Sequence, residues 1–572
     1  MIQSSRRRVC MPCEADDRPA AVGGRHVAVI VALGAFVLVP QLFLRDVWGP
    51  DETRFAEVAR EMIVSGDYIV PHLNGARYAE KPPVFFWLTA AAWPLCGVNA
   101  GRVVAVAAGL GALLLTYRLG RRLYGAAEGL WAALVMASCL LFIGVARAGI
   151  LDSLLLLAIL AAVNCGYEAL EGAGRRAGAA WLGFYASLAV GALVKGPVVL
   201  VGAGLVVLAY GLAYLKSMRG GGWWHLAGAA LFATLVAAWL VPAMVSGGEE
   251  YSRYLVVEQA ARRVSGTMSH EEPFYYYLLR WPLYFFPWSL MLPLALAGAW
   301  RAGGREARLP VIWFAVLFVA YSAVAGKAER YVLPLVPAVA LACGRYVGRA
   351  AGEGVRWPRL HAAAWGASFV VMLSLAAGLW TVAAKPALLA KALTRDARGP
   401  ALVAAQTTPA RRGLAAVAGA VVATCAIGGL RLLRRGEGER RRAAALLAAM
   451  ATVALSFDLV ALGPMDQFKA ERRLVAEMAP YLEAADELYL HATEYGGIVN
   501  LFTQRERIPV LETFEDVAKA VASPRPVAVV MWKKEAGKML GTPRFHIIPE
   551  HAEFRNPVLV VNWEPSAAAG RP

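Results

Sequence analysis

The chain places acidic and basic residues side by side directly after its first long apolar run. In the stretch GPDETRFAEVAREM (49–62), Asp51 and Glu52 are followed by Arg54. An ionised carboxylate is costly next to lipid and is rarely found there without a partner or a function. Carboxylates suit acid–base chemistry or a divalent cation, whereas arginine suits a phosphate group. The stretch therefore predicts a charged site at the end of an apolar helix.

Further residues of these types lie in short polar segments that border apolar runs, in NGARYAEKPP, ARAGILD, SHEEPFYYY and GKAERYVLPLVP. With the first stretch, the candidate site residues are Asp51, Glu52, Arg54, Glu80, Lys81, Asp152, His270, Lys327, Arg330 and Tyr331. The cations of this set suit a phosphate. The carboxylates with His270 suit acid–base work or a divalent metal.

Each candidate also has a purely structural interpretation. Asp51 can cap the amphipathic helix that follows it. Glu80 and Lys81 can form a solvated pair before a Pro-Pro turn, Asp152 can complement a helix dipole, and Arg330 can extend from the interface toward water. The functional interpretation depends on whether these separate segments meet on one side of a membrane.

Composition indicates a membrane protein with many helical crossings. Of 572 residues, 58% are hydrophobic and only 17% are charged, which differs from a soluble protein of this size. The net charge of +17 would suggest nucleic acid in a soluble chain. Here the basic residues fall between apolar runs, as the positive-inside rule requires, so we expect no nucleic-acid partner.

We expect about thirteen transmembrane helices, each long enough to cross a hydrocarbon core of roughly 30 Å. They are 27–44, 102–119, 130–146, 150–167, 180–195, 197–215, 226–245, 282–300, 310–326, 331–347, 362–383, 413–430 and 443–463. A cleaved secretory signal is an alternative for the N-terminus, but no small-residue cleavage site follows the first run, so we expect a retained helix.

This assignment of helices, oriented by the positions of lysine and arginine, places residues 1–26 in the cytoplasm. It defines a transmembrane domain over 27–463, with long outer loops at 45–101 and 246–281. All candidate site residues then fall on the outer side. Residues 84–98, with Pro94, are too short for a comfortable span and are expected to lie along or dip into the interface. The basic segment 384–412 disagrees with the rule, which indicates either nearby anionic lipid or one miscounted span.

The last segment, 464–572, is expected to form a small periplasmic α/β domain. ERRLVAEMAPYLEAADELYLH reads as an amphipathic helix leading into a strand, and PVAVVMWKKEA and PVLVVNWEP read as strands.

The first outer loop, DETRFAEVAREMIVSGDYIVPHLNGARYAEKPPVFFWL, resembles that of the bacterial lipid A aminoarabinose transferases. More broadly it resembles the protein O-mannosyltransferase-like membrane glycosyltransferases. SHEEPFYYYLLRWPLYFFPW and GKAERYVLPLVP resemble two later family segments in the expected order. The resemblance covers roughly residues 27–350. It implies a C-type glycosyltransferase fold and transfer of a sugar from a polyprenyl phosphate, usually undecaprenyl phosphate in bacteria.

The resemblance also implies roles for the candidate residues. Asp51 would be the catalytic aspartate and Asp152 a second acidic residue of the cavity. Lys81, Lys327 and Arg330 would contact the lipid phosphate, with Glu52, Arg54 and Tyr331 as further substrate-binding residues. Glu80 and His270 match positions associated with a divalent metal, zinc in this family. No nucleotide cofactor is expected.

We therefore expect a bacterial inner-membrane enzyme with a periplasmic active site. It would take the sugar donor and a lipid or glycan acceptor, such as lipid A, another envelope glycan or a protein, and act as a monomer among membrane lipids. The alternative is a transporter or flippase for an anionic lipid or a lipid-linked glycan. Transporters tend to bind substrate near the midplane between repeated halves, and we find no repeat, which favours the enzyme.

Overall fold

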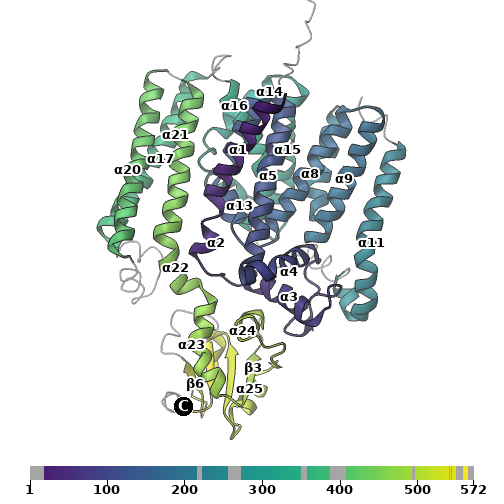
Figure 1. The fold of residues 1–572 in the computed structure, drawn as a ribbon, viewed down its shortest axis with the longest axis vertical. Helices are drawn as coiled ribbons and strands as arrows, with labels where there is room; N and C mark the ends of the chain where they lie inside the picture. The colour runs from purple at the N-terminus through teal and green to yellow at the C-terminus, as the bar shows by residue number, and fades with distance from the viewer. Residues whose placement is uncertain are drawn as a thin grey trace, which may run out of the picture.

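Apolar helices packed into a bundle, with a small α/β domain at one end, make up the fold (Figure 1). The computed structural model describes residues 19–214, 222–255, 272–349, 357–386, 407–436, 438–491, 496–539, 541–542, 544–548 and 558–564. Within these residues, ten helices are long and apolar enough to cross a membrane, or up to eleven if one bent pair counts as a single span. The prediction of a multi-pass helical membrane protein is confirmed.

The first part of the bundle runs from the N-terminal helix to the middle of the chain. Its helices are α1 (Pro19–Leu38), α2 (Gln41–Leu44), α3 (Asp51–Ser65), α4 (Val84–Cys96), α5 (Ala100–Tyr124), α6 (Ala126–Ala137), α7 (Leu140–Ala146), α8 (Asp152–Glu171), α9 (Gly174–Lys195), α10 (Leu205–Ala213) and α11 (Gly222–Arg253). Strands β1 (His72–Leu73) and β2 (Ala76–Arg77) form an antiparallel hairpin between α3 and α4.

The second part completes the bundle and continues into the C-terminal domain. Its helices are α13 (Tyr276–Tyr284), α14 (Leu292–Arg301), α15 (Arg305–Ala323), the 3₁₀ segment η5 (Glu329–Leu335), α16 (Val336–Arg349), α17 (Pro358–Ala384), α20 (Pro409–Arg434), α21 (Glu439–Ser456) and α22 (Leu462–Lys469).

The described spans are fewer than the thirteen expected because three of the thirteen segments are not long, uninterrupted helices. Residues 130–146 form the end of α6 and all of α7, which are bent by 67° at the break between them. Residues 197–215 contain the short helix α10, and 282–300 are divided between α13 and α14. Hydropathy over a window measures apolar length and does not detect such breaks.

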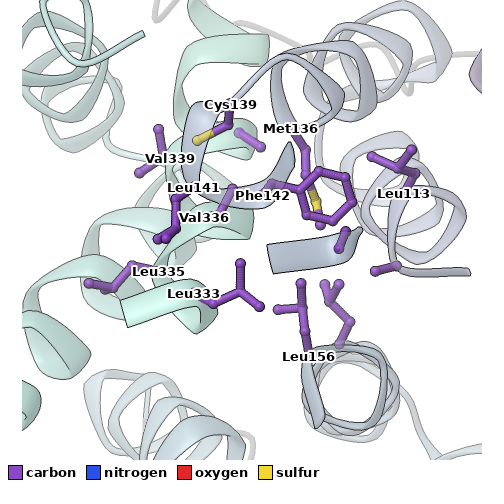
Figure 2. Packing of buried hydrophobic residues seen from close by; sticks show 14 of the residues in the cluster. Leu113, Met136, Cys139, Leu141, Phe142, Leu156, Leu333, Leu335, Val336 and Val339 are labelled. Carbon is purple, nitrogen blue, oxygen red and sulfur yellow. The ribbon is translucent and has the colours of Figure 1, made fainter. Parts of the chain in front are cut away.

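A continuous apolar core joins helices that are far apart in the sequence. Figure 2 shows Leu113 of α5, Phe142 of α7, Leu156 of α8, Leu333 of η5 and Val336 of α16 in one cluster of apolar side chains. All these side chains are buried. The later residues of η5 are thus packed in the apolar core, which fixes the place of Arg330 near the start of the same segment.

Basic residues gather at one end of the bundle. Arg122, at the end of α5, lies 2.6 Å from Glu168 of α8, and Arg305, at the start of α15, lies 3.0 Å from Glu171. Figure 1 shows α3, α4 and the C-terminal domain at the opposite end. The cytoplasmic location of the end that carries Arg122 and Arg305 stays a prediction from the positive-inside rule.

The C-terminal domain contains the expected helix and strands. They are α23 (Glu471–Ala484), β3 (Glu487–His491), α24 (Gly496–Thr503), β4 (Val510–Leu511), α25 (Phe514–Val521), β5 (Val527–Met531), α26 (Lys533–Ala536), β6 (His546–Ile548) and β7 (Val558–Val561). The sheet order is β4-β3-β5-β7-β6, with β3 parallel to β4 and β5, and β7 antiparallel to its neighbours. The α/β character predicted from the sequence is confirmed.

Candidate active site

The carboxylate of Asp51 lies between two arginines from distant parts of the chain. Arg54, one turn further along α3, donates from Nη2 to Oδ1 over 2.5 Å, and Arg330 of η5 lies 2.7 Å from Oδ2. Asp51 does not cap α3, because Pro50 holds the cap position and no side-chain cap hydrogen bond is present there. The structure thus connects the first outer loop with the segment that begins η5.

The charge state of Asp51 follows from these neighbours. Burial opposes ionisation, but the guanidinium groups of Arg330 and Arg54, together with the ammonium of Lys81, outweigh burial and hold the pKa of Asp51 below its usual value. Asp51 is therefore an anion at neutral pH, and its two oxygens are already engaged by cations.

Glu80 and Lys81 lie next to this pair, after the β1–β2 hairpin. Glu80 Oε2 is 3.6 Å from Nη1 of Arg54 and 3.8 Å from Nζ of Lys81. The phenol of Tyr78 donates to the same carboxylate oxygen over 3.2 Å. The Glu80 carboxylate therefore lies within ion-pair distance of both Arg54 of α3 and Lys81 in the segment after the hairpin.

Asp152 and Tyr331 form a second part of the same site through Lys195. Asp152, the first residue of α8, lies 2.5 Å from Nζ of Lys195 at the end of α9. The same ammonium lies 5.1 Å from the centre of the Tyr331 ring. The carboxylates of Asp51 and Asp152 both act on the Arg330 guanidinium, so the two pairs share one electrostatic environment.

Glu52 is adjacent to Asp51 in sequence but belongs to a different contact network. Its carboxylate is buried and accepts two hydrogen bonds from Arg45, one from the backbone N–H of Trp48 and one from that of Gly149. Burial opposes ionisation, but the hydrogen bond from Arg45 helps to hold the pKa of Glu52 below its usual value. The oxygens of Glu52 are therefore engaged within the protein, and its substrate-binding role stays a prediction.

Lys327 is likewise used within the protein. Its ammonium donates to the carbonyl oxygens of Val324, over 2.6 Å, and Glu272, over 2.8 Å, and the residue is 3% exposed. Lys327 is thus held in the turn before η5. Its contact with the lipid phosphate, which the resemblance implies, stays a prediction.

The residues expected to hold a metal are only partly described. His270 lies outside the described residues. Glu80 faces Arg54, Lys81 and the phenol of Tyr78, and no group of three or more His, Cys, Asp or Glu side chains in the described ranges could hold an ion. The donor set at Glu80, as far as the structure describes it, does not fit a metal site.

A cavity of about 500 Å³ opens beside Glu80. Its polar and aromatic lining comes from the end of the hairpin and the residues after it, and from the end of α11 and the residue after it: Arg77, Tyr78, Glu80, Glu250, Tyr251 and Tyr254. The hydroxyl of Tyr251 is buried and has no hydrogen-bond partner among the described residues. A cavity with aromatic walls, carboxylates and an unpaired phenol suits a polar ligand such as a sugar.

Some residues of this arrangement had no assigned role in the sequence analysis. Lys195 follows an apolar run in the same way as several other cations, and nothing in its spacing indicates Asp152 as its partner. Arg45 is a single basic residue at the end of the first apolar run. Tyr251 lies in the segment 246–281, which the sequence predicted as an outer loop, and the structure places it in the last turns of α11.

Comparison with known proteins supports the sequence resemblance. Residues 80–242 match the family described as dolichyl-phosphate-mannose-protein mannosyltransferase. The chain is 36% identical over 325 residues to the undecaprenyl phosphate-alpha-4-amino-4-deoxy-L-arabinose arabinosyl transferase 1 of Sodalis glossinidius, covering 54% of this chain and 57% of that protein. The corresponding transferase of Edwardsiella ictaluri is 32% identical over 352 residues, covering 59% and 61%. The matches thus span about three fifths of the length of these relatives.

The fold matches over nearly the whole chain. The crystal structure of ArnT from Cupriavidus metallidurans bound to undecaprenyl phosphate superposes with a TM-score of 0.75 at 22% sequence identity, covering 97% of this chain and 100% of that one. The apo structure of the same protein gives a TM-score of 0.75 at 20% identity. The resemblance predicted from the first outer loop is confirmed, and the chain has the ArnT-like fold of the C-type membrane glycosyltransferases.

Proposed function

We propose that this protein is a membrane glycosyltransferase that moves a sugar from an undecaprenyl-phosphate donor to an acceptor at the periplasmic face of the inner membrane. The observation that carries the proposal is the cluster in which Arg54 and Arg330 engage Asp51, with Lys81 and Lys195 nearby. The relatives whose names state this activity and the shared fold support it.

The cations of the cluster suit the departing phosphate. When the bond between the anomeric carbon and the phosphate oxygen breaks, the lipid-linked phosphodiester becomes a phosphomonoester and gains one negative charge. Arg54, Lys81 and Arg330 come from different segments and are held in place by carboxylates. Preorganised charge aimed at a developing anion is commonly the largest contribution to such catalysis.

The ionisation of Asp51 favours an acceptor that is already an anion. A general base works best when its pKa lies near the working pH, whereas the pKa of Asp51 is held below the ordinary value. Asp51 is therefore a weak base toward a neutral hydroxyl, but its charge can orient the acceptor complex and stabilise the positive charge that develops on the sugar. A phosphate acceptor, such as a phosphate of lipid A, needs no base to become a nucleophile.

The cavity beside Glu80 supports 4-amino-4-deoxy-L-arabinose as the transferred sugar, the sugar in the names of the relatives. Tyrosine rings can pack against the sugar ring, and the carboxylates of Glu80 and Glu250 can face its ammonium group. A transporter accounts less well for the arrangement, because α3, which carries Asp51 and Arg54, lies at one end of the bundle and not at its middle (Figure 1).

Direct assay of the donor tests the proposal. Purified full-length protein in nanodiscs is supplied with undecaprenyl phosphate-aminoarabinose and lipid A, and both donor loss and modified lipid A are measured. We expect Asp51→Asn and Lys81→Ala each to reduce turnover by roughly 100-fold or more, the usual effect of removing one preorganised charge. Lys519→Ala, at an exposed position of α25, is the matched control. Full activity in both site variants would disprove the assignment.

A further inference from the structure

The C-terminal domain contacts the elements that carry the cluster. Helix α24 packs on α3, and a Cβ atom added to Gly497 would lie 3.3 Å from Cα of Arg54 and 3.4 Å from Cβ of Glu57. Glycine thus allows the two helices to approach closely at the residue that engages Asp51. Arg60 of α3 also donates to the carbonyl oxygen of Arg505 over 3.1 Å.

The β1–β2 hairpin precedes Tyr78, Glu80 and Lys81, and the turn of this hairpin is hydrogen-bonded to α3. Asn74 and Gly75 form this turn with φ of 56° and 69°, a conformation for which an Asn-Gly pair is preferred. Their backbone N–H groups donate to the two carboxylate oxygens of Glu61, over 2.6 Å and 3.1 Å. The hairpin and α3 therefore form one unit.

The side chain of Asn74 connects this unit to the C-terminal domain. Its Nδ2 donates to the carbonyl oxygen of Ile508 over 2.8 Å, and its Oδ1 accepts from the backbone N–H of Ile508 over 2.7 Å. The same Oδ1 accepts from Nδ2 of Asn500, which is fully buried, over 2.9 Å. A single side chain thus makes three hydrogen bonds across the boundary between the domains.

We propose that Asn74 and Asn500 are positioning residues for the transfer reaction, through which the C-terminal domain holds the Tyr78–Lys81 segment against Asp51 and Arg54. The inference rests on the proposed function, since its catalytic consequence is the placement of Lys81 near the donor phosphate. Displacing a charged group by about 1 Å can cost on the order of 100-fold in rate, so three hydrogen bonds that fix the hairpin can control turnover without contacting substrate.

Asn74→Gly in the full-length protein is the test. Glycine adopts the positive φ without strain, so the turn and its backbone bonds to Glu61 remain while the three side-chain bonds are lost. We expect kcat to fall by about 10- to 100-fold with a smaller change in KM. Asn74→Asp keeps Oδ1 as an acceptor and should restore part of the rate.

A double-mutant cycle and a matched control separate positioning from general destabilisation. Because Asn500→Ala removes one of the same bonds, Asn74→Gly with Asn500→Ala should be little worse than Asn74→Gly alone. Asn562 makes comparable hydrogen bonds inside the C-terminal domain, to Ser523, Arg525 and Val527. Asn562→Ala should lower the melting temperature while leaving the kcat of the folded protein unchanged.

Amide hydrogen exchange gives a readout that does not depend on activity. In Asn74→Gly, exchange at residues 76–81 should rise while exchange in α5 and α8 stays the same. Unchanged exchange at 76–81, or a wild-type kcat in Asn74→Gly, would overturn the inference. A wild-type protein that transfers no sugar would disprove the proposed function instead, and the exchange measurement would still decide whether the hairpin is held by Asn74.

Discussion

At the scale of single residues, the central feature is a carboxylate shared by two guanidinium groups. Arg54 is a neighbour of Asp51 along one helix, but Arg330 reaches the same carboxylate from the start of η5. Each partner lowers the pKa of Asp51 against the effect of burial. This arrangement keeps Asp51 ionised and places two cations where a phosphate can approach, so acid–base chemistry at Asp51 is disfavoured relative to electrostatic stabilisation.

The pH dependence of turnover tests this interpretation. In Arg330→Met, burial still raises the pKa of Asp51 and one of the groups that lowers it is gone, so the pKa rises. Protonation of Asp51 then begins at higher pH, and the acid limb of the kcat profile should move to higher pH than in the wild type. Initial rates of donor consumption across the acidic range measure the shift. Arg525→Met, at an exposed site of the C-terminal domain, should leave the profile in place.

At the scale of elements, Glu52 joins segments that would otherwise be independent. Arg45 follows α2, Trp48 lies in the turn before α3, and Gly149 lies in the turn between α7 and α8, and all three donate to the Glu52 carboxylate. The orientation of α3, and hence of Asp51, depends on this contact with the bundle. Glu52 therefore acts on the site through the position of a helix.

Removing Glu52 should reduce stability. Glu52→Ala leaves the buried guanidinium of Arg45 without its carboxylate, and losing one partner of a buried ion pair costs about 3–5 kcal/mol. Thermal unfolding of the purified protein should show a strongly lowered midpoint. Replacing both partners, in Arg45→Met with Glu52→Leu, should recover part of the loss. A Glu52→Gln protein with wild-type stability and weakened donor binding would instead support the substrate-binding role predicted from the sequence.

At the scale of the whole molecule, the junction between the bundle and the C-terminal domain is polar and lies close to the site. Trp48 donates from its indole nitrogen to Asp466 over 2.6 Å, and Arg472 lies 3.1 Å from Asp46. Glu471 lies in the same junction, and burial, reinforced by the nearby Glu52 carboxylate, raises its pKa to about 7. The junction therefore contains a group that titrates near neutral pH.

Glu471 should make stability depend on pH. The folded protein holds the proton up to about pH 7, whereas an unfolded chain releases it near the ordinary value of 4.5. The folded state binds more protons between these values, so the stabilisation is complete below about pH 4.5 and is lost as the pH rises through 7. The melting temperature should fall over this range, and Glu471→Gln should flatten the fall. Glu483→Gln, at an exposed position of the same helix, should keep the wild-type slope.

Sequence patterns alone were sufficient to predict the structural features that depend on local composition. Apolar length and the placement of arginine indicated the bundle, and helix and strand periodicity indicated α23, β3, β5 and β7. The residues Asp51, Arg54, Glu80 and Lys81 could be predicted as one group because a single loop carries them. Hydropathy could not show where a helix breaks, so α7, α10 and α14 were each expected as part of a longer span.

Tertiary structure alone decided which charge meets which. Lys195 and Lys327 each follow an apolar run, yet only Lys195 reaches a site carboxylate, while Lys327 donates to two carbonyl oxygens of its own turn and of the preceding segment. Glu52, one residue from Asp51, points into the protein and is held by Arg45. The physical reason is that helix packing determines the orientation of side chains within the last few ångströms, whereas charge type and spacing determine only which partners are chemically possible.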